Sequence, residues 1–242
     1  MDRLPTLKVT FDTPIKNWEI SAFRGAMAKK VGLEHSWYHN HNNNDKPIDN
    51  KTSWEFSTEK YHYRYPLIQY KVDNRSGKTR PMMLCIGHCV EEAHRFFSQA
   101  EWDIILNGKQ RHLSIYRMDV HEYSLEVAPG DFTYNVFNWL PLNAENYEKY
   151  KSKNGLIEQL TFLEHLLNQH LVSLFRSFDA NTENALKATI TAFRKEKWMA
   201  YKGNNKLLAF DISFKVNTFL PEYIGIGKGV SRGFGVVRKD RS

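Results

Sequence analysis

The chain is poor in cysteine, which excludes the classes of site that need several thiols. Its 242 residues contain two cysteines, Cys85 and Cys89, with His88 between them. Two thiols cannot supply the four ligands of a structural zinc site, and no second cysteine pair completes the set. We therefore expect reduced, partly buried thiols, as in a cytoplasmic protein, and neither a metal nor another cofactor.

Long hydrophobic runs are also missing. No stretch approaches the roughly eighteen apolar residues of a membrane-spanning helix. The N-terminal segment MDRLPTLKVTF has no apolar core of the kind that a signal peptide carries. The sequence thus predicts a cytoplasmic protein without a membrane segment.

The well-known nucleotide-binding glycine motifs are absent as well. A dinucleotide-binding G-x-G-x-x-G motif that starts at Gly225 or at Gly227 fails, because its third glycine falls on Val230 or on Arg232. A Walker loop needs Ser or Thr after Gly-Lys, but Gly229 follows Gly227-Lys228. The sequence therefore favours neither class of nucleotide-binding protein.

Positive charge and aromatic side chains are abundant. The formal net charge is +7, the pI is about 9.2, and aromatic residues make up 14% of the chain. Lysine and arginine neutralise phosphates, and aromatic rings stack on unpaired bases. This composition favours a polyanionic partner such as RNA, although we expect more than half of the aromatic residues in the core.

A glycine-rich stretch, YIGIGKGVSRGFGVV, covers residues 223–237 and includes Lys228 and Arg232. Strand-like runs precede it at residues 207–219 and follow it at residues 234–238. Its backbone N–H groups and cations suit phosphate binding, because glycine permits positive φ and close approach. A wide hairpin turn, in which the glycines serve geometry alone, fits equally well.

The first half of the chain predicts the element order β-α-β-β-α-β, which is the ferredoxin-like arrangement. Apolar alternation predicts strands over residues 7–11, 67–72, 81–86 and 104–106, and a helical period predicts helices over residues 21–31 and 90–102. Residues 34–50 are polar and predict a loop, and residues 54–65 have a partial period of two. A linker is expected at residues 107–111.

The second half also predicts a sheet with helices. Strands are expected over residues 114–118, 124–127 and 132–140, with a turn at Pro129-Gly130 and a charged connection over residues 143–153. An apolar stripe predicts the longest helix over residues 156–178. A hairpin is expected from residues 188–201 and 207–219.

The glycine spacing resembles that of a known family. Gly225-x-Gly227, five residues and then Gly233-x-Gly235, close to the C-terminus, are similar to the glycine-rich loop of the RAMP proteins. Within these, the chain resembles the Cas-six endoribonucleases that cut CRISPR precursor transcripts. The resemblance implies an α+β protein with two tandem ferredoxin-like (RAMP/RRM-like) domains, which we place at residues 1–108 and 109–242, with the glycine loop in the second.

The segment Trp37-Tyr38-His39-Asn40-His41-Asn42 is the most suggestive for catalysis. In an extended chain, His39 and His41 share one face, about 6.5 Å apart. Histidine titrates near neutral pH, so such a pair can act as acid and base when a ribose 2′-hydroxyl attacks the adjacent phosphate. A polar surface loop, or a partial metal site with Asp45 and Asp49, explains the same residues.

The resemblance implies catalysis by His39 and His41, with Tyr38 as the local tyrosine. A catalytic lysine is also common in the family, and Lys29, Lys30, Lys46 and Lys51 are candidates here. The expected RNA-binding residues are the loop cations and glycines together with two cations near the first helix: Lys228, Arg232, Gly225, Gly227, Gly233, Gly235, Arg24 and Lys30.

Three hypotheses follow. The first is a metal-independent endoribonuclease that cleaves CRISPR precursor RNA within its repeats and leaves a 2′,3′-cyclic phosphate and a 5′-hydroxyl. The second is a non-catalytic RAMP-type subunit that binds CRISPR RNA. The third is a metal-dependent nuclease that uses His and Asp of residues 35–49. The expected partners are CRISPR repeat RNA and a CRISPR effector complex, with the protein a monomer or homodimer.

Overall fold

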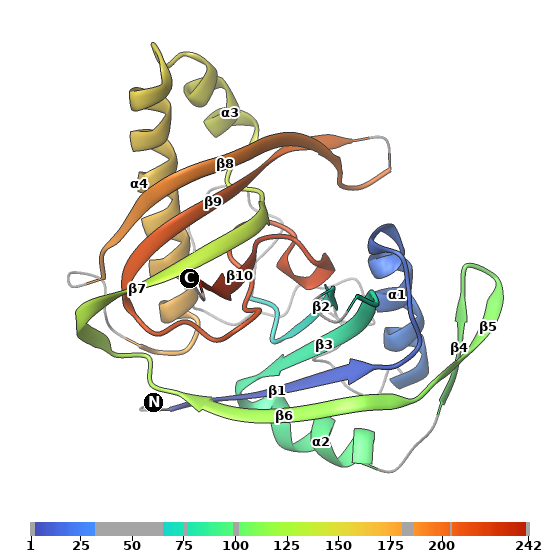
Figure 1. Cartoon of the computed structure of the whole chain (residues 1–242). Coiled ribbons are helices and arrows are strands. Elements are labelled where there is room, and N and C mark those ends of the chain that lie inside the picture. The colour runs from blue at the N-terminus through green and yellow to red at the C-terminus, as the bar shows by residue number, and fades with distance from the viewer. Residues whose placement is uncertain are drawn as a thin grey trace, which may run out of the picture. The chain divides into compact units, whose positions relative to one another are not determined.

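The computed structural model describes residues 3–31, 65–74, 77–98, 102–180, 186–203 and 205–240 (Figure 1). The chain divides into two compact units. The N-terminal unit is Leu7–Asp119. The C-terminal unit combines Val120–Ser242 with the first residues, Met1–Thr6. Within the described residues, no helix is long and apolar enough to cross a membrane.

The N-terminal sheet has four strands in the order β2-β3-β1-β6. Its helices, α1 and α2, follow β1 and β3 along the chain, so the predicted β-α-β-β-α-β order is confirmed. The strands are β1 (Leu4–Phe11), β2 (Ile68–Asp73), β3 (Arg80–Ile86) and β6 (Ile115–Tyr123), and the helices are α1 (Ile20–Val31) and α2 (Val90–Ser98). Gly77, between β2 and β3, has a φ of +75°.

The order is confirmed, but the prediction that residues 104–106 form the last strand of this sheet is wrong. Residues 104–106 belong to β4 (Trp102–Leu106), which pairs with β5 (Lys109–Leu113) in a separate two-stranded sheet. The expected linker is the turn of this hairpin and the first part of β5. The helix expected to reach Trp102 ends at Ser98. The sheet is completed instead by β6, which had been assigned to the second half.

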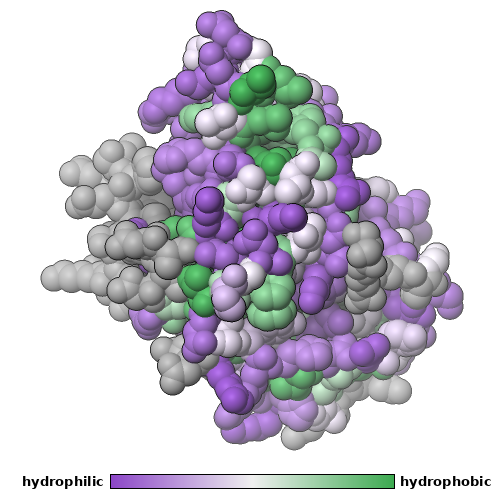
Figure 2. All heavy atoms as spheres, turned by 60° about the vertical axis from the view of Figure 1, so that its left-hand side comes forward, coloured by the Kyte–Doolittle hydropathy of each residue, from purple (hydrophilic) through white to green (hydrophobic). Residues whose placement is uncertain are grey.

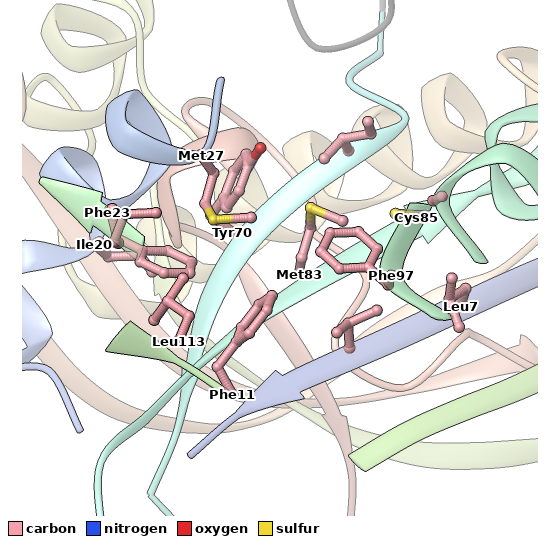
Figure 3. Close-up of a cluster of buried hydrophobic side chains, with 14 of the residues drawn as sticks. Leu7, Phe11, Ile20, Phe23, Met27, Tyr70, Met83, Cys85, Phe97 and Leu113 are labelled. Carbon is pink, nitrogen blue, oxygen red and sulfur yellow. The ribbon is translucent and has the colours of Figure 1, made fainter. Parts of the chain in front are cut away.

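The core of the N-terminal unit lies between its helices and one face of its sheet. Figure 3 shows Phe11, Phe23 and Phe97 gathered with Tyr70 and Met83. Edge-to-face contacts join Phe11 to Phe23 at 5.6 Å and to Phe97 at 5.8 Å between ring centroids. Such pairs contribute about 0.5–1.5 kcal/mol beyond their burial, so the phenylalanines of β1, α1 and α2 fix the helices on the sheet.

Both cysteines are buried in this unit and are free thiols. Burial and the neighbouring Cys89 raise the pKa of the Cys85 thiol well above its usual value. The Cys89 thiol donates to the carbonyl oxygen of Ile86 at 3.2 Å. The thiolate form of Cys85 is therefore disfavoured, and both buried cysteines act as core side chains.

The C-terminal sheet has the order β10-β7-β9-β8. In sequence order its strands are β7 (Val127–Trp139), β8 (Ala188–Ala200), β9 (Lys206–Thr218) and β10 (Val236–Lys239), so the spatial order 4-1-3-2 is that of the N-terminal sheet. Helices α3 (Ala144–Lys151) and α4 (Leu156–Arg176) lie between β7 and β8. The glycine-rich segment occupies the chain position of a second helix, between β9 and β10. The predicted α+β fold with two ferredoxin-like halves is confirmed.

Three local predictions in this half need correction. Pro129-Gly130 does not separate two strands: it lies within β7, where the register to β9 shifts between Val127 and Phe132. The strand predicted over residues 114–118 is β6, which runs from Ile115 to Tyr123. The charged connection contains helix α3, because the Asn143 side chain accepts a hydrogen bond from the Asn146 amide at 2.7 Å and caps its start.

Candidate nucleic-acid interface at the glycine-rich hairpin

The glycine-rich segment is a hairpin. Its first residues run beside β10: the Tyr223 amide donates to the Val237 carbonyl at 2.8 Å, and the Val237 amide donates to the Ile224 carbonyl at 2.9 Å. The Ile226 amide donates to the Gly235 carbonyl at 2.9 Å. Residues 227–234 form the connecting loop, so the alternative of a wide hairpin turn describes its backbone correctly.

Three of the glycines are required by this geometry. Gly227, Gly229 and Gly235 have φ values of +80°, +76° and +61°. A Cβ at Gly227 would lie 2.9 Å from the Trp139 ring, and one at Gly229 would lie 2.8 Å from the Tyr201 ring. At Gly235 it would lie 1.9 Å from the Ile226 carbonyl oxygen. Only glycine fits such backbone and packing.

Several loop amides already have partners within the chain. The Lys228 amide donates to the Leu140 carbonyl at 3.1 Å, and the Gly235 amide donates to the Asn138 carbonyl at 3.0 Å. The Arg232 amide donates to the Gly229 carbonyl at 2.9 Å. Because these N–H groups already donate to carbonyl oxygens, they are not available to a phosphate. Binding of an anion by the loop therefore depends on its charged side chains.

The loop's two cations meet at Tyr201, just after β8. The Arg232 guanidinium lies 4.5 Å from the centroid of the Tyr201 ring, and its Nη1 donates to the Tyr201 carbonyl at 2.9 Å. The Lys228 ammonium lies 5.3 Å from the same ring. Phe234 packs on Tyr201 at 5.8 Å. Two cations and an aromatic ring are thus held together, a combination that can bind phosphates and stack on bases. We call Tyr201, Lys228, Arg232 and Phe234 the Tyr201 cluster.

A histidine supports the hairpin from α4. The Trp139 indole N–H donates to Nδ1 of His170 at 3.2 Å, and Gly227 packs against the same indole. Burial lowers the pKa of His170 from 6.5 to about 4. Protonation of Nδ1 would break this hydrogen bond, so the link between α4 and the loop requires neutral imidazole.

We expect the stability of the protein to fall between pH 6.5 and pH 4 because of His170. The unfolded state takes up a proton near pH 6.5, whereas the folded state resists protonation until about pH 4. The unfolded state therefore binds more protons in this window, at a cost of up to about 3 kcal/mol. Urea unfolding at pH 7 and pH 4.5 measures the loss.

His170→Asn is the matched variant, because asparagine keeps an acceptor for the Trp139 N–H but does not titrate. We expect it to lose less stability than the parent between the two pH values. An equal loss in both proteins would assign the pH dependence to other groups.

The remaining predicted site residues fall into two groups. Arg24 and Lys30 lie on α1 in the N-terminal unit. Hydrogen bonds from His112 and Gln110 lower the pKa of the nearby Asp103 carboxyl, and the charge of Lys30 adds to this effect. Tyr38, His39 and His41 lie outside the described residues, as do Asp45, Asp49, Lys46 and Lys51. Among the described residues, no group of three or more His, Cys, Asp or Glu side chains could hold a metal ion.

The sequence pattern gave no reason to single out Lys71. It is fully buried in β2, and burial lowers its pKa to about 7. Burial has this effect because the low-dielectric core disfavours the charged ammonium. Alternation on a strand predicts which face a residue takes but not whether that face is covered, so burial here depends on tertiary structure.

A hydrophobic patch on the C-terminal unit does not fit a nucleic acid. Ile157 and Leu156, in the first turn of α4, are 82% and 59% exposed, and a shallow depression beside them is lined by Phe162, Thr161 and His165. Figure 2 shows hydrophobic surface gathered in the upper part of the molecule. Lys153 also lines this depression, with its ammonium 5.8 Å from the centroid of the Phe162 ring. The Tyr201 cluster holds two cations at one ring, so it is the better candidate for RNA.

Comparison with known proteins agrees with the sequence resemblance. A family model of the Cas6b N-terminal domain matches residues 2–124, and one of the Cas6b C-terminal domain matches residues 126–240. An uncharacterized protein of Methanocaldococcus jannaschii, MJ0978, is 34% identical over 146 residues, which are 56% of this chain and 95% of that protein.

Solved structures are similar over nearly the whole chain. A crystal structure of Cas6b has a TM-score of 0.78 and 27% identity, with 98% of this chain and 100% of that chain covered. A crystal structure of the CRISPR RNA processing endoribonuclease Cas6b has a TM-score of 0.66 and 26% identity, with the same coverage. Since the two family models together span almost all of its length, this chain belongs to the Cas6b family.

Proposed function

We propose that this protein is a metal-independent endoribonuclease that cleaves CRISPR precursor RNA within its repeats. The observation that carries the proposal is the match of both Cas6b domain models, which together account for residues 2–124 and 126–240. A similar structure is named as a CRISPR RNA processing endoribonuclease. The net charge of +7 and the Tyr201 cluster give the chain the means to hold RNA.

The proposed reaction is an attack of the ribose 2′-hydroxyl on the adjacent phosphate. One imidazole of His39 and His41 removes the 2′-hydroxyl proton, and the other protonates the leaving 5′-oxygen. The new bond joins O2′ to phosphorus as the P–O5′ bond breaks, so the products carry a 2′,3′-cyclic phosphate and a 5′-hydroxyl. Tyr38 assists at the same place, and general acid–base catalysis of this kind contributes about 10²–10⁴-fold.

The RNA-binding part of the proposal rests on the hairpin. Lys228 is exposed and Arg232 is half-buried beside Tyr201. Their charges attract phosphates, and a pair of cations held against an aromatic ring loses less side-chain freedom on binding than two free cations. Gly225, Gly227, Gly233 and Gly235 contribute by shaping the loop, and Arg24 and Lys30 contribute further contacts from α1.

Cleavage of a labelled repeat RNA in EDTA tests the function. We expect full activity without divalent metal, and a product whose 3′ end resists phosphatase until acid opens the cyclic phosphate. Loss of activity on chelation, with recovery on adding Mg²⁺, would favour a metal-dependent nuclease instead. Tight repeat binding without any cleavage would identify a non-catalytic RNA-binding subunit, with a CRISPR effector complex as its further partner.

A further inference from the structure

One face of the C-terminal sheet carries a polar row across all four strands. Cross-strand pairing places Arg238 of β10 beside Asn135 of β7, and Asn135 beside Ser213 of β9. Directly paired residues point to the same face, and their neighbours along each strand point to the other. Phe214 and Ile212, which flank Ser213, are fully buried on that opposite face.

A β-bulge adds Arg194 of β8 to this row. Pairing between β8 and β9 shifts between Phe193, opposite Ile212, and Lys195, opposite Asp211. Arg194 is the extra residue, and its Nε donates to Ser213 Oγ at 2.6 Å. Consecutive side chains normally alternate, but the bulge turns Arg194 and Lys195 toward one face. We call Arg194, Ser213, Asn135 and Arg238 the arginine row.

Both arginines are held in place by neighbours. Ser213 Oγ accepts from Arg194 and donates to Asn135 Oδ1 at 2.6 Å, and both of these polar residues are buried. Arg194 itself is exposed, and no partner for its terminal Nη groups occurs among the described residues. The Arg238 guanidinium lies 5.0 Å from the Tyr223 ring centroid and 5.4 Å from that of Phe137.

The charge on this face is largely positive. Lys195 and Lys215 are exposed beside the row. The acid that pairing places here, Asp211, is neutralised by Lys197 at 2.7 Å and also accepts from the Asn138 amide at 2.6 Å. An oriented guanidinium with free N–H groups in a positive field is a phosphate-binding arrangement.

We infer that the arginine row binds the phosphates of an RNA strand, with Arg194 as its main contact. The inference rests on the proposed RNA-processing function and adds a site outside the glycine-rich hairpin. The row offers guanidinium groups to a ligand, because the Ser213 hydroxyl and the Asn135 side chain are buried and bonded to each other. The flanking rings, Phe137 and Tyr223, lie under Arg238 instead of being open to bases. The arginine row therefore contacts the RNA backbone and does not distinguish between base sequences.

The test compares Arg194→Ala with the parent on two RNAs, the repeat RNA and an oligouridylate of the same length. Dissociation constants are measured between about 50 and 200 mM KCl. We expect binding of both RNAs to weaken about tenfold at low salt, since one charge-assisted contact is lost. The slope of log K against log salt should fall by about 0.7.

Three further variants separate the row from net charge and test whether Ser213 acts through Arg194. Arg95→Ala removes one exposed arginine from α2, which is paired only loosely with Glu91 at 4.0 Å, and should change affinity less than twofold. Ser213→Ala should weaken binding about threefold because it releases the Arg194 guanidinium. The double variant of Arg194 and Ser213 should bind no more weakly than Arg194→Ala alone, because both act through one contact.

Equal effects of Arg95→Ala and Arg194→Ala would overturn the inference, because overall charge would then explain both. Unchanged RNA affinity of Arg194→Ala would also overturn it, and would leave this face to a protein partner. A loss confined to the repeat RNA would contradict backbone recognition. If the parent binds no RNA at all, the proposed function itself fails, which distinguishes that outcome from failure of the row.

Discussion

Replacing His39 and His41 together with alanine is expected to slow single-turnover cleavage of repeat RNA by at least about a hundredfold. Alanine cannot take the proton from the 2′-hydroxyl or give one to the leaving oxygen, whereas the phosphate contacts that we propose for Lys228 and Arg232 persist. RNA affinity should therefore stay within about twofold of the parent. The rate is measured with enzyme in excess, and affinity is measured by filter binding in the same buffer.

The control is His165→Ala, which removes an exposed imidazole that hydrogen-bonds Gln169 on α4. It should cleave at the parental rate. Tyr38→Phe tests the adjacent hydroxyl and should lower the rate less than the double histidine variant. Parental cleavage by the double variant would refute the assigned chemistry and leave the family assignment untouched. A large loss of cleavage rate in His165→Ala would indicate that the catalytic centre lies on α4.

The regular elements of this fold could be predicted because each carries its own period. Leucines recur along α4 at helical spacing, and Leu163, Leu167, Leu171 and Leu174 are all buried. The β8–β9 hairpin combines two long alternating runs with Gly203 at the turn. Local sequence is sufficient in such cases, since burial of one face decides the conformation.

The β4–β5 hairpin and helix α3 were not predicted, although the sequence carries a local signal for each. Asn107-Gly108 is a strong two-residue hairpin signal, and both residues adopt positive φ, 51° and 76°. A linker is predicted there instead of a hairpin, so the predicted fourth strand of the sheet falls on β4 and not on β6. Helix α3 had an N-cap at Asn143 and a Glu145–Lys149 pair at i, i+4.

The candidate interface was predictable in part. The cations Lys228 and Arg232 stood out by their place among glycines, but nothing in the sequence placed Tyr201 between them. The sequence also does not reveal the bulge at Arg194, because a bulge depends on the register between two strands and not on the residues of one strand. Long-range pairing of this kind requires the three-dimensional structure.

Gly235→Ala is expected to destabilise the protein by about 3 kcal/mol, from positive φ and from steric conflict. An added Cβ would lie 1.9 Å from the Ile226 carbonyl oxygen, in the pair that closes the hairpin. The backbone must shift, which disturbs the contacts of β10 with Tyr223–Ile226. We expect the melting temperature to fall by about 6–12 °C, as measured by calorimetry.

Gly130→Ala is the matched control, since a Cβ there meets nothing within 4 Å and its φ is not positive; its melting temperature should match the parent. The comparison also separates the two interpretations of the glycines. If they act through geometry, Gly235→Ala loses stability and RNA affinity together, while Lys228→Ala loses affinity at unchanged stability. A Gly235→Ala protein that melts like the parent yet binds RNA poorly would instead show that this backbone contacts the phosphates directly.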